Sequence, residues 1–351
     1  MSIFNGKKIA LEIYGESHAE KIGVKIKGYP KMQINMENLA EFLKRRQAKK
    51  AVYSTSRIES DLPIFLGLNQ DKIDGDFTAE IINSNKRSND YNSLYGKPRP
   101  SHADYAWSVK DGVLDFSGGG RFSGRLTAPF CIAGGIAKQY LESLGIKIEA
   151  YVSKVGKVQA KSYKSAKITV EDVLRERVGD FPSLDKKQEI IEEITNAKVQ
   201  GDSVGGKVEC VVNGLKAGLG DNLFSGLEGK ISYLCYAIPA VKSVEFGLGE
   251  EFSESLGSMV NDSLYFEDQV VKTKTNNSGG INGGISNGND ITLAVTFRPT
   301  PSISKEQDSV DLVNKTNVKI QIQGRHDSCI VPRAVPVVES AVAIALLDEI
   351  L

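Results

Sequence analysis

The stretch PFCIAGGIAKQYLESLGIKIEAYVSKVGKVQA, residues 129–160, joins an apolar segment with helical spacing to a strand-like run. Proline at its start and Gly145 after Leu144 are typical of the first position of a helix and of the position just past its end. Small residues lie between the large apolar ones, which predicts a mostly buried helix. The run KIEAYVSKVGKVQA (147–160) then predicts a strand. A buried helix next to a strand indicates helices layered on sheets.

Further helices are predicted from caps and apolar spacing. Asn35 is a typical N-cap, and the helix after it ends with Arg45 and Arg46. Residues 185–197 have the spacing of an amphipathic surface helix. Its buried stripe is expected to be Ile190, Ile191 and Ile194. From about Val337 to the C-terminus the chain is apolar nearly all round, which predicts an interior helix.

Strand-like runs recur along the chain, namely KIALEIYG (8–15), GVKIKG (23–28), GKVECVVNG (206–214) and ITLAVTF (291–297). Several alternate polar and apolar residues, the pattern of a sheet with one solvated face. Strands and helices come in blocks and not in strict βαβ alternation. This favours an α+β fold with antiparallel sheets around a central helical layer. No Pro/Ser-rich linker divides the chain, whose length fits one large domain or two smaller ones.

The composition excludes several classes of protein. Lys+Arg and Asp+Glu are equal at 44 each, so no global charge favours nucleic acid or an anionic membrane. The N-terminus lacks the apolar core of a signal peptide, and the apolar C-terminal segment is too short to span a bilayer. The four cysteines form no CxxC pair. We therefore expect reduced thiols in a cytoplasmic protein, without a metal site.

A glycine- and arginine-rich segment, SGGGRFSGRLTAPF (117–130), leads into the predicted buried helix. Exposed backbone N–H groups, two arginines and a helix N-terminus together suit a phosphate or a carboxylate. The spacing of GGRFSG matches a P-loop, but Arg125 and Leu126 stand where that motif needs Lys and Ser or Thr. The segment thus predicts an anion site and not a magnesium-nucleotide site.

Arginines recur in other polar loops, namely KRRQAKKAVYSTSRIESD (44–61), TFRPTPSIS (296–304) and QGRHDSCIVPRAVP (323–336). The planar guanidinium matches the edges of carboxylates and phosphates. Solvated ion pairs explain any single arginine, but their recurrence beside glycine clusters indicates a ligand with several negative charges.

The chain has only three histidines, and each lies in such a loop. Histidine transfers protons near neutrality, with an ordinary pKa of about 6.5. No HExxH or Cys/His spacing supports a metal. A triad can be drawn from Ser17, His102 and Asp327, but Ser17 does not lie in a G-x-S-x-G elbow. Acid–base work beside bound anions fits better, although a hydrogen-bonded loop residue is equally compatible with each histidine.

Taken together, the motifs resemble the chorismate synthase family. They run in family order through YGESHAE (14–20), RPSHADY (99–105), GGGRFSGRLT (118–127), GDSVGGKVE (201–209), SGGINGGISNG (278–288), FRPTPSI (297–303) and GRHDSCIVPRAVP (324–336). The resemblance implies one chorismate synthase-like domain over residues 1–351, with a layered β–α–β sandwich.

The resemblance also implies a reaction. The substrate would be 5-enolpyruvylshikimate 3-phosphate, and 1,4-elimination of phosphate would give chorismate. Reduced FMN would be required without net redox change. A separate flavin reductase would supply it, and NAD(P)H oxidation by this chain would count against that expectation. The family usually assembles as a homotetramer.

Site residues carry over from the family's motifs. By resemblance, His18 would protonate the leaving phosphate, His102 would stabilise the anionic reduced ring near its N1/C2 edge, and Asp327 would assist proton removal. The expected FMN contacts are Arg121, Phe122, Ser123, Pro239, Ala240, Gly283, Arg298, Pro299, Thr300, Pro301, Ser302 and Arg325. The candidates for binding the substrate's anionic groups are Arg46, Arg57 and Arg125.

The sequence departs from the family pattern at several positions. Ala19 and Ser101 stand where glycine is usual, and Val52 stands where arginine is usual. Leu126 replaces a glutamate and Pro239 an asparagine. The changes at Val52 and Pro239 bear on how tightly substrate and flavin bind. The alternative is a divergent flavin-binding protein without lyase activity.

Overall fold

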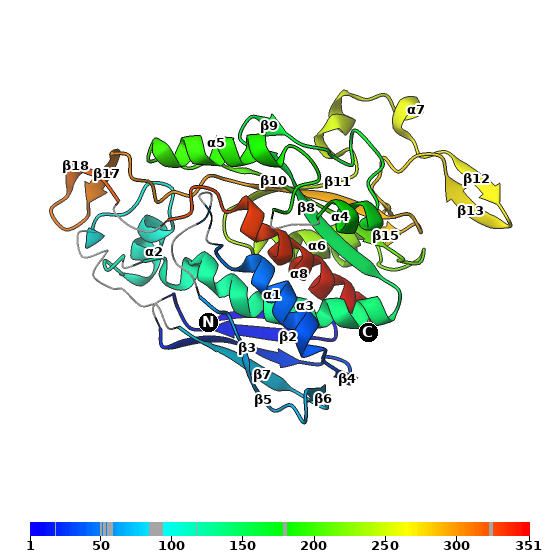
Figure 1. Cartoon of the computed structure of the whole chain (residues 1–351), viewed down its shortest axis with the longest axis horizontal. Helices are drawn as coiled ribbons and strands as arrows, with labels where there is room; N and C mark the ends of the chain where they lie inside the picture. The colour runs from blue at the N-terminus through cyan, green and yellow to red at the C-terminus, as the bar shows by residue number, and fades with distance from the viewer. Residues whose placement is uncertain are drawn as a thin grey trace.

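The computed structural model describes residues 1–17, 19–49, 51, 54, 59–83, 94–116, 118–177, 181–322 and 326–351. Within that part of the chain, two five-stranded antiparallel sheets enclose a layer of helices (Figure 1). One hydrophobic cluster extends through both sheets and the helices between them. The predicted α+β fold, a layered β–α–β sandwich, is confirmed.

The first sheet has the strand order β1-β2-β3-β7-β5. Its strands are β1 (Ser2–Asn5), β2 (Ala10–Tyr14), β3 (Lys21–Lys27), β7 (Phe77–Ile82) and β5 (Ile64–Leu66). In β3 the side chains of Ile22, Val24 and Ile26 are buried, whereas Lys21, Lys25 and Lys27 are exposed. One face of this sheet is therefore solvated, as the alternation predicts.

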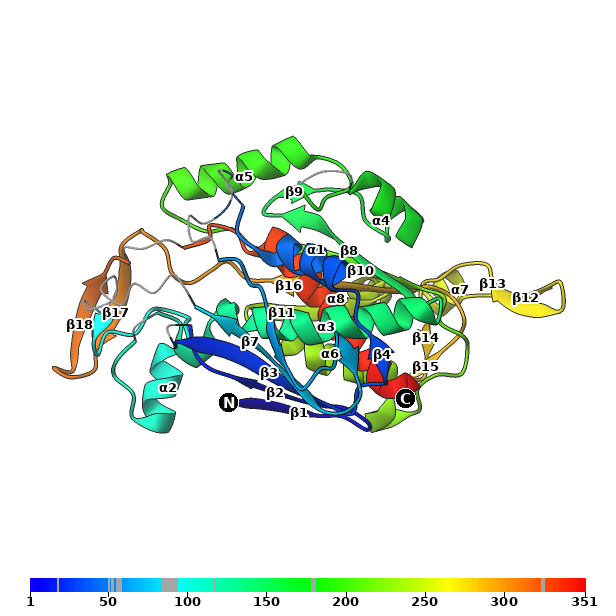
Figure 2. The same cartoon turned by 60° about the horizontal axis from the view of Figure 1, so that its bottom comes forward.

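The second sheet has the order β11-β16-β10-β8-β9. Its strands are β11 (Val241–Phe246), β16 (Ile291–Phe297), β10 (Gly206–Asn213), β8 (Lys147–Val155) and β9 (Val158–Gln159). The expectation of a solvated face is wrong here, because α4 (Val170–Glu176) and α5 (Lys187–Val199) lie outside it (Figure 2). Tyr151 and Val211 are buried against Val170 and Val173 of α4. Strands β8, β10 and β16, unlike the edge strands β9 and β11, are buried along nearly their whole length.

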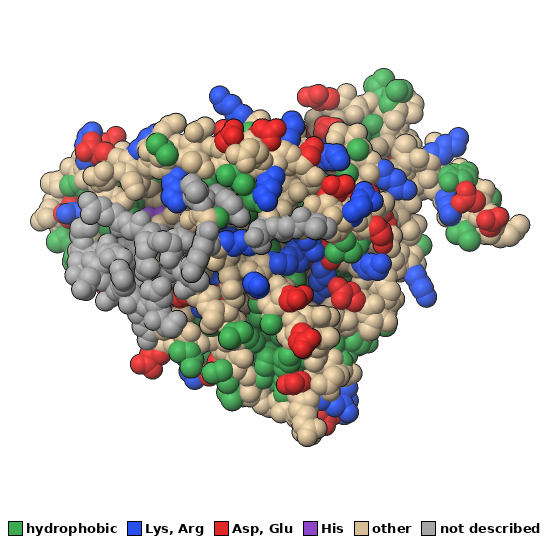
Figure 3. Space-filling view, in the orientation of Figure 1, with side chains coloured by type: hydrophobic (Ala, Val, Ile, Leu, Met, Phe, Trp, Pro, Cys, Tyr) green, Lys and Arg blue, Asp and Glu red, His purple; other side chains and the backbone are tan. Residues whose placement is uncertain are grey.

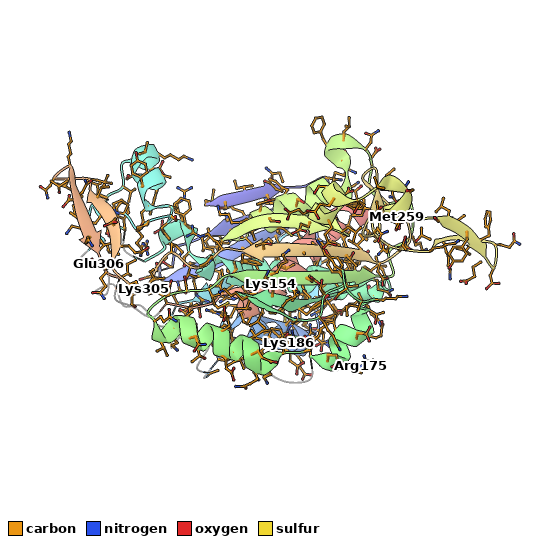
Figure 4. The ribbon with its side chains drawn as sticks, turned by 90° about the horizontal axis from the view of Figure 1, so that it is seen from above. Lys154, Arg175, Lys186, Met259, Lys305 and Glu306 are labelled. Atoms are coloured by element: carbon orange, nitrogen blue, oxygen red, sulfur yellow. The ribbon has the colours of Figure 1, made fainter. Side chains whose placement is uncertain are left out.

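Seen from above, α5 and α4 run along one side of the second sheet, near the labelled Lys186 and Arg175 (Figure 4). The apolar stripe of α5 is narrower than predicted. Ile190 and Ile194 are buried, but Ile191 is only partly buried. The helix begins at Lys187, two residues later than the sequence predicts.

The middle layer contains α1 (Met36–Arg46), α3 (Thr127–Ser143), α6 (Leu227–Tyr236) and α8 (Val331–Ile350). The Asn35 side chain accepts a hydrogen bond from Asn38 N, which confirms the predicted cap of α1. Gly134 of α3 faces α8 so closely that an added Cβ would lie 2.1 Å from Ser340 Cβ. Small residues in α3 thus allow the two buried helices to pack backbone to backbone.

Helix α8 begins at Val331, six residues before the predicted start. Pro332 lies in its first turn, where a missing N–H has no intrahelical partner to lose. Pro336 forgoes one internal hydrogen bond. The early start places the N-terminus of the helix at the cavity described below.

The remaining elements are β4 (Met32–Gln33), β6 (Lys72–Ile73), α2 (Asp104–Asp111), η2 (Gly120–Phe122), η3 (Gly124–Leu126), η4 (Leu223–Ser225), η5 (Gly249–Glu254), α7 (Gly257–Val260), β12 (Leu264–Glu267), β13 (Val270–Thr273), β14 (Ile281–Asn282), β15 (Ile285–Ser286), β17 (Gln307–Asp311) and β18 (Thr316–Ile320). The β12–β13 and β17–β18 hairpins extend at opposite ends of the molecule (Figure 1). Acidic and basic side chains are interspersed over the face in Figure 3, in keeping with the zero formal charge.

A buried carboxylate, Glu339 of α8, joins the layers. Its carboxylate accepts hydrogen bonds from both terminal guanidinium nitrogens of Arg45 at 2.6 and 2.8 Å, from Lys138 Nζ at 3.3 Å and from the backbone N–H of Ala150 at 2.9 Å. Burial alone would raise the pKa of Glu339, but the charges of Arg45 and Lys138 outweigh it and hold that pKa at about 2. Ionised Glu339 thus binds α1, α3 and β8 to α8.

We expect this carboxylate to make the fold acid-sensitive. Its folded pKa lies below its ordinary value, so its contribution is complete above about pH 4.5 and is lost as pH falls toward about 2. The loss is on the order of 3 kcal/mol. Urea unfolding of the wild type and Glu339→Gln between pH 6 and pH 2.5 measures it. The stability gap between the two proteins should narrow as pH falls, and a constant gap would contradict the assignment.

Candidate active site

A cavity of about 700 Å³ opens where the predicted loops meet. It lies between the end of α1, the Arg99–Ala103 loop, the glycine-rich segment, the end of β16 and the start of α8. The predicted site residues that line it are Arg46, His102, Arg121, Phe122, Ser123, Arg125, Pro239, Ala240, Arg298, Thr300, Pro301, Ser302 and Asp327. Segments far apart in the sequence thus converge on one cavity.

Other predicted site residues are placed differently. His18, Arg57 and Arg325 lie outside the described residues. Pro299 is not part of the cavity lining. Gly283 lies in the turn between β14 and β15, where Gly284 O accepts the N–H of Leu227 at the start of α6. The cavity lies at the other end of α6, so Gly283 does not reach the cavity of its own chain.

The glycine-rich segment forms the short helices η2 and η3 directly before α3. Gly120 has a φ of +50°, a conformation that favours glycine, and an added Cβ would lie 3.1 Å from the Trp107 ring. The Ser123 side chain accepts the Arg125 N–H at 3.2 Å. Gly120 O accepts the N–H of Ser17 at 3.3 Å, which joins the first motif to this segment. These contacts set the direction in which the Arg125 side chain enters the cavity wall.

Two of the predicted anion-binding arginines share a buried carboxylate. Arg46 Nη2 lies 2.5 Å from Asp61 Oδ2, and Arg125 Nη1 donates to Asp61 Oδ1. Arg125 Nε also lies 3.1 Å from Glu59 Oε2, and Arg46 Nη1 donates to Thr127 Oγ1 at 3.1 Å. Burial alone raises the pKa of Asp61, but Arg46 and Arg125 outweigh it and hold that pKa below its ordinary value.

These arginines nevertheless keep unused donors. Arg46 Nε and Arg125 Nη2 are buried with no hydrogen-bond partner in the described part of the chain. A buried charged donor without a partner is unfavourable, so both nitrogens suit an acceptor that arrives with a ligand. Because Asp61 holds the two guanidinium groups together, one ligand can meet both.

His102 lies beside an acidic group that sequence reasoning did not select. His102 Nδ1 is 2.5 Å from Asp104 Oδ1, and Asp104 is also paired with Arg99. Ser101 has a φ of +60°, which explains physically why glycine suits this position better. Arg298 Nη1 donates to Ser101 O at 2.5 Å and thereby joins the end of β16 to this loop.

Asp327 lines the same cavity, as does its neighbour in sequence, His326. Its carboxylate is paired with Arg333 of α8, and its carbonyl accepts the hydroxyl of Thr300 at 2.9 Å. Arg333 Nε in turn donates to Arg46 O at 2.9 Å. A Ser17–His102–Asp327 triad is not assembled, because the Nδ1 of His102 faces Asp104 and Asp327 pairs with Arg333.

Sequence reasoning missed the partners that hold the site together. Asp61 and Glu59 lie in the quoted stretch 44–61, and Arg99 and Asp104 lie within RPSHADY. Their position within or beside these motifs was the only signal in the sequence that could have identified them as site residues, since their buried pairing depends on tertiary contacts. Ala240, by contrast, is among the predicted flavin contacts. It adopts a φ of +75°, and its carbonyl accepts a hydrogen bond from the N–H of Arg298 at 3.0 Å.

Other chemistry has less support within the described residues. They contain no group of His, Cys, Asp and Glu arranged to hold a metal ion, and none of their helices is long and apolar enough to cross a membrane. The four cysteines are buried and unpaired. Burial raises the pKa of Cys131, Cys235 and Cys329 to about 12, so these groups stay protonated thiols near neutral pH.

Comparison with known proteins agrees with the motifs. The family model for chorismate synthase matches residues 9–351. A chorismate synthase of Methanobrevibacter smithii is 41% identical over 351 residues, covering 99% of this chain and 95% of that protein. One of Pyrococcus abyssi is 41% identical over 350 residues, covering 99% and 97%. A crystal structure of chorismate synthase matches with a TM-score of 0.77 at 25% identity, covering 98% of this chain and 92% of that one.

These matches extend over nearly the full length of the chain, and they confirm the resemblance inferred from its motifs. The chain belongs to the chorismate synthase family of shikimate-pathway enzymes.

Proposed function

We propose that the chain converts 5-enolpyruvylshikimate 3-phosphate into chorismate and phosphate by 1,4-elimination, with reduced FMN required but not consumed. The observation that carries this proposal is the pair of unsatisfied buried donors, Arg46 Nε and Arg125 Nη2, in one cavity. The substrate has a phosphate and two carboxylates, which supply the acceptors that these donors lack.

The cavity also fits a flavin mononucleotide. Its volume of about 700 Å³ lies within the range of cofactor sites. Among the described residues, Arg298 has only main-chain oxygens as recorded acceptors, those of Ser101 and Pro299, so its charge remains available for a phosphate. The residues that would hold the flavin are the cavity-lining members of the predicted set, namely Arg121, Phe122, Ser123, Pro239, Ala240, Arg298, Thr300, Pro301 and Ser302.

The elimination breaks one C–H and one C–O bond of the substrate ring and forms the second ring double bond. The C–O electron pair leaves with phosphate and the proton passes to an acceptor, so no net oxidation occurs. Reduced flavin, when bound, supplies transient electron donation that weakens the C–O bond. Arg46 and Arg125 would orient the substrate's anionic groups, His102 would offset the negative charge that bound reduced flavin brings, and Asp327 would assist proton removal. His18, expected to protonate the phosphate, lies outside the described residues.

An anaerobic assay tests this function. Purified protein is mixed with 5-enolpyruvylshikimate 3-phosphate, with and without FMN reduced by dithionite, and released phosphate is measured. Phosphate should appear only with reduced flavin. Flavin binding without phosphate release under any condition would instead favour a flavin-binding protein without lyase activity. Release that depends on Mg²⁺ and ATP would indicate a phosphotransferase.

The remaining expectations concern partners. A homotetramer and a separate flavin reductase follow from the family resemblance, and a cytoplasmic location follows from the four cysteines without a CxxC pair. The purified chain with FMN should therefore not oxidise NAD(P)H, since the resemblance assigns that step to another protein.

A further inference from the structure

The imidazole of His102 has two charged neighbours at the start of α2. Its Nδ1 lies 2.5 Å from Asp104 Oδ1 and 3.2 Å from Arg99 Nη2. The side chains of Arg99 and Asp104 are each 2% exposed, and that of His102 is 15% exposed. His102 is thus the most exposed of the three side chains, and it lines the cavity together with Arg99.

The two contacts make opposite demands on Nδ1. A bond to the carboxylate needs a proton on Nδ1, whereas a bond from the guanidinium needs a lone pair there. Arg99 Nη2 already donates to Asp104 Oδ1 at 2.8 Å and to Gly118 O at 2.5 Å, so it does not need the imidazole as an acceptor. The shorter contact, with Asp104, therefore determines the tautomer, and Nδ1 carries a proton that it donates to Asp104 Oδ1.

We propose that Asp104 is a positioning residue that fixes the tautomer of His102 and offsets its charge, so that Nε2 is the nitrogen available for chemistry. This inference rests on the proposed function for its catalytic meaning, but not for its test. Neutral His102 then accepts a hydrogen bond at Nε2. Protonated His102 donates there, with its charge offset by Asp104.

Arg99 keeps Asp104 in place and charged. Arg99 Nε and its backbone N–H both donate to Asp104 Oδ2, at 2.7 and 3.0 Å. Burial would raise the pKa of Asp104, but the hydrogen bonds from Arg99 and His102 lower it to about 2. Arg99 Nη1 also lies 3.4 Å from Ser302 Oγ. One arginine thus joins the glycine-rich segment, the β16 loop and the carboxylate that holds His102.

Other charges near His102 come from neighbouring elements. Arg298, at the end of β16, bonds Ser101 O next to His102, and Arg121 of η2 lines the same cavity. Both are cationic. Among these groups Asp104 is the one carboxylate in direct contact with His102 in the described structure. Replacing Asp104 should therefore change which ring nitrogen of His102 carries the proton.

Nitrogen-15 NMR of histidine-labelled protein tests the proposal directly, because the chain contains three histidines and each ring nitrogen reports its own protonation. His102→Gln assigns the His102 signals. The wild type should show Nδ1–H at neutral pH. In Asp104→Asn the amide can donate to Nδ1, so the Nε2–H tautomer should appear. The kcat for phosphate release should fall by about 10²-fold, with a smaller change in KM.

Asp172→Asn is the matched control. Asp172 lies in the first turn of α4, bonds Thr169 and pairs with Arg175 at 2.6 Å, away from the cavity. It should leave the His102 signals and kcat unchanged. If Asp104→Asn fails to fold because Arg99 loses its partner, the double variant Arg99→Gln, Asp104→Asn removes both charges. An unchanged His102 tautomer in whichever variant folds would overturn the proposal. If the wild type releases no phosphate, the tautomer readout still decides it.

Discussion

Replacement of His102 by glutamine is expected to lower the kcat for phosphate release by about 10²–10⁴-fold, the usual contribution of one acid–base group. Glutamine retains hydrogen-bonding capacity but cannot take up a proton. His102 lines the cavity with 15% of its side chain exposed, so the substitution changes the surface that a ligand meets. Stopped-flow measurement of phosphate release with reduced FMN gives the rate at which phosphate is eliminated.

Flavin binding should survive this substitution, and the chain contains its own reporter. Trp107 is the only tryptophan, and its ring centroid lies 5.4 Å from that of Phe122, which lines the cavity. Bound flavin should therefore quench the tryptophan fluorescence. Tyr105→Phe is the matched control, since Tyr105 is an exposed residue of α2, the helix that contains Trp107, and does not line the cavity. A His102→Gln protein with the kcat of the wild type would contradict the acid–base assignment.

Local signals predicted much of the fold, and long-range packing explains the differences. The Asn35 cap and the glycine after α3 act within one helical turn, so the sequence alone places those helices within about two residues. The start of α8 was predicted too late because two prolines locally argue against a helix. Pro332 is nevertheless compatible with the first turn, and Pro336 lies inside the helix at the loss of one hydrogen bond. The burial of both faces of the second sheet depends on α4 and α5, which its strands do not encode.

The candidate site shows the same division. Motif positions such as Arg125, His102 and Asp327 could be selected from sequence, and the fold brings them to one cavity. The carboxylates that orient them could not, because Asp61 lies 15 residues from Arg46 in sequence and is recognisable as its partner only in three dimensions. Gly283 illustrates the converse, since its motif is clear but its place in the fold is distant from the cavity of the same chain.

Asp61→Asn is expected to destabilise the protein by about 3–5 kcal/mol, because it leaves two buried guanidinium groups without their shared counter-charge. Arg125 keeps Glu59 as a partner, whereas Arg46 keeps only the hydroxyl of Thr127 among its recorded side-chain partners. The variant cavity therefore has an additional positive charge where the substrate's anions are proposed to bind. Urea unfolding at pH 7 measures the loss of stability.

The same variant should gain more from an anion than the wild type does. A ligand that binds only the folded state stabilises it in proportion to its affinity, and the uncompensated Arg46 and Arg125 should bind inorganic phosphate more tightly than the pair neutralised by Asp61. Thermal unfolding in phosphate and in sodium chloride of equal ionic strength separates this binding from screening. Asp74→Asn, which removes an exposed partner of Lys31, is the control and should respond as the wild type does. An equal rise in Tm for all three proteins would contradict this prediction. A rise no larger in phosphate than in sodium chloride would show that the buried donors do not bind the anion, and the proposed substrate-binding role of both arginines would then be wrong.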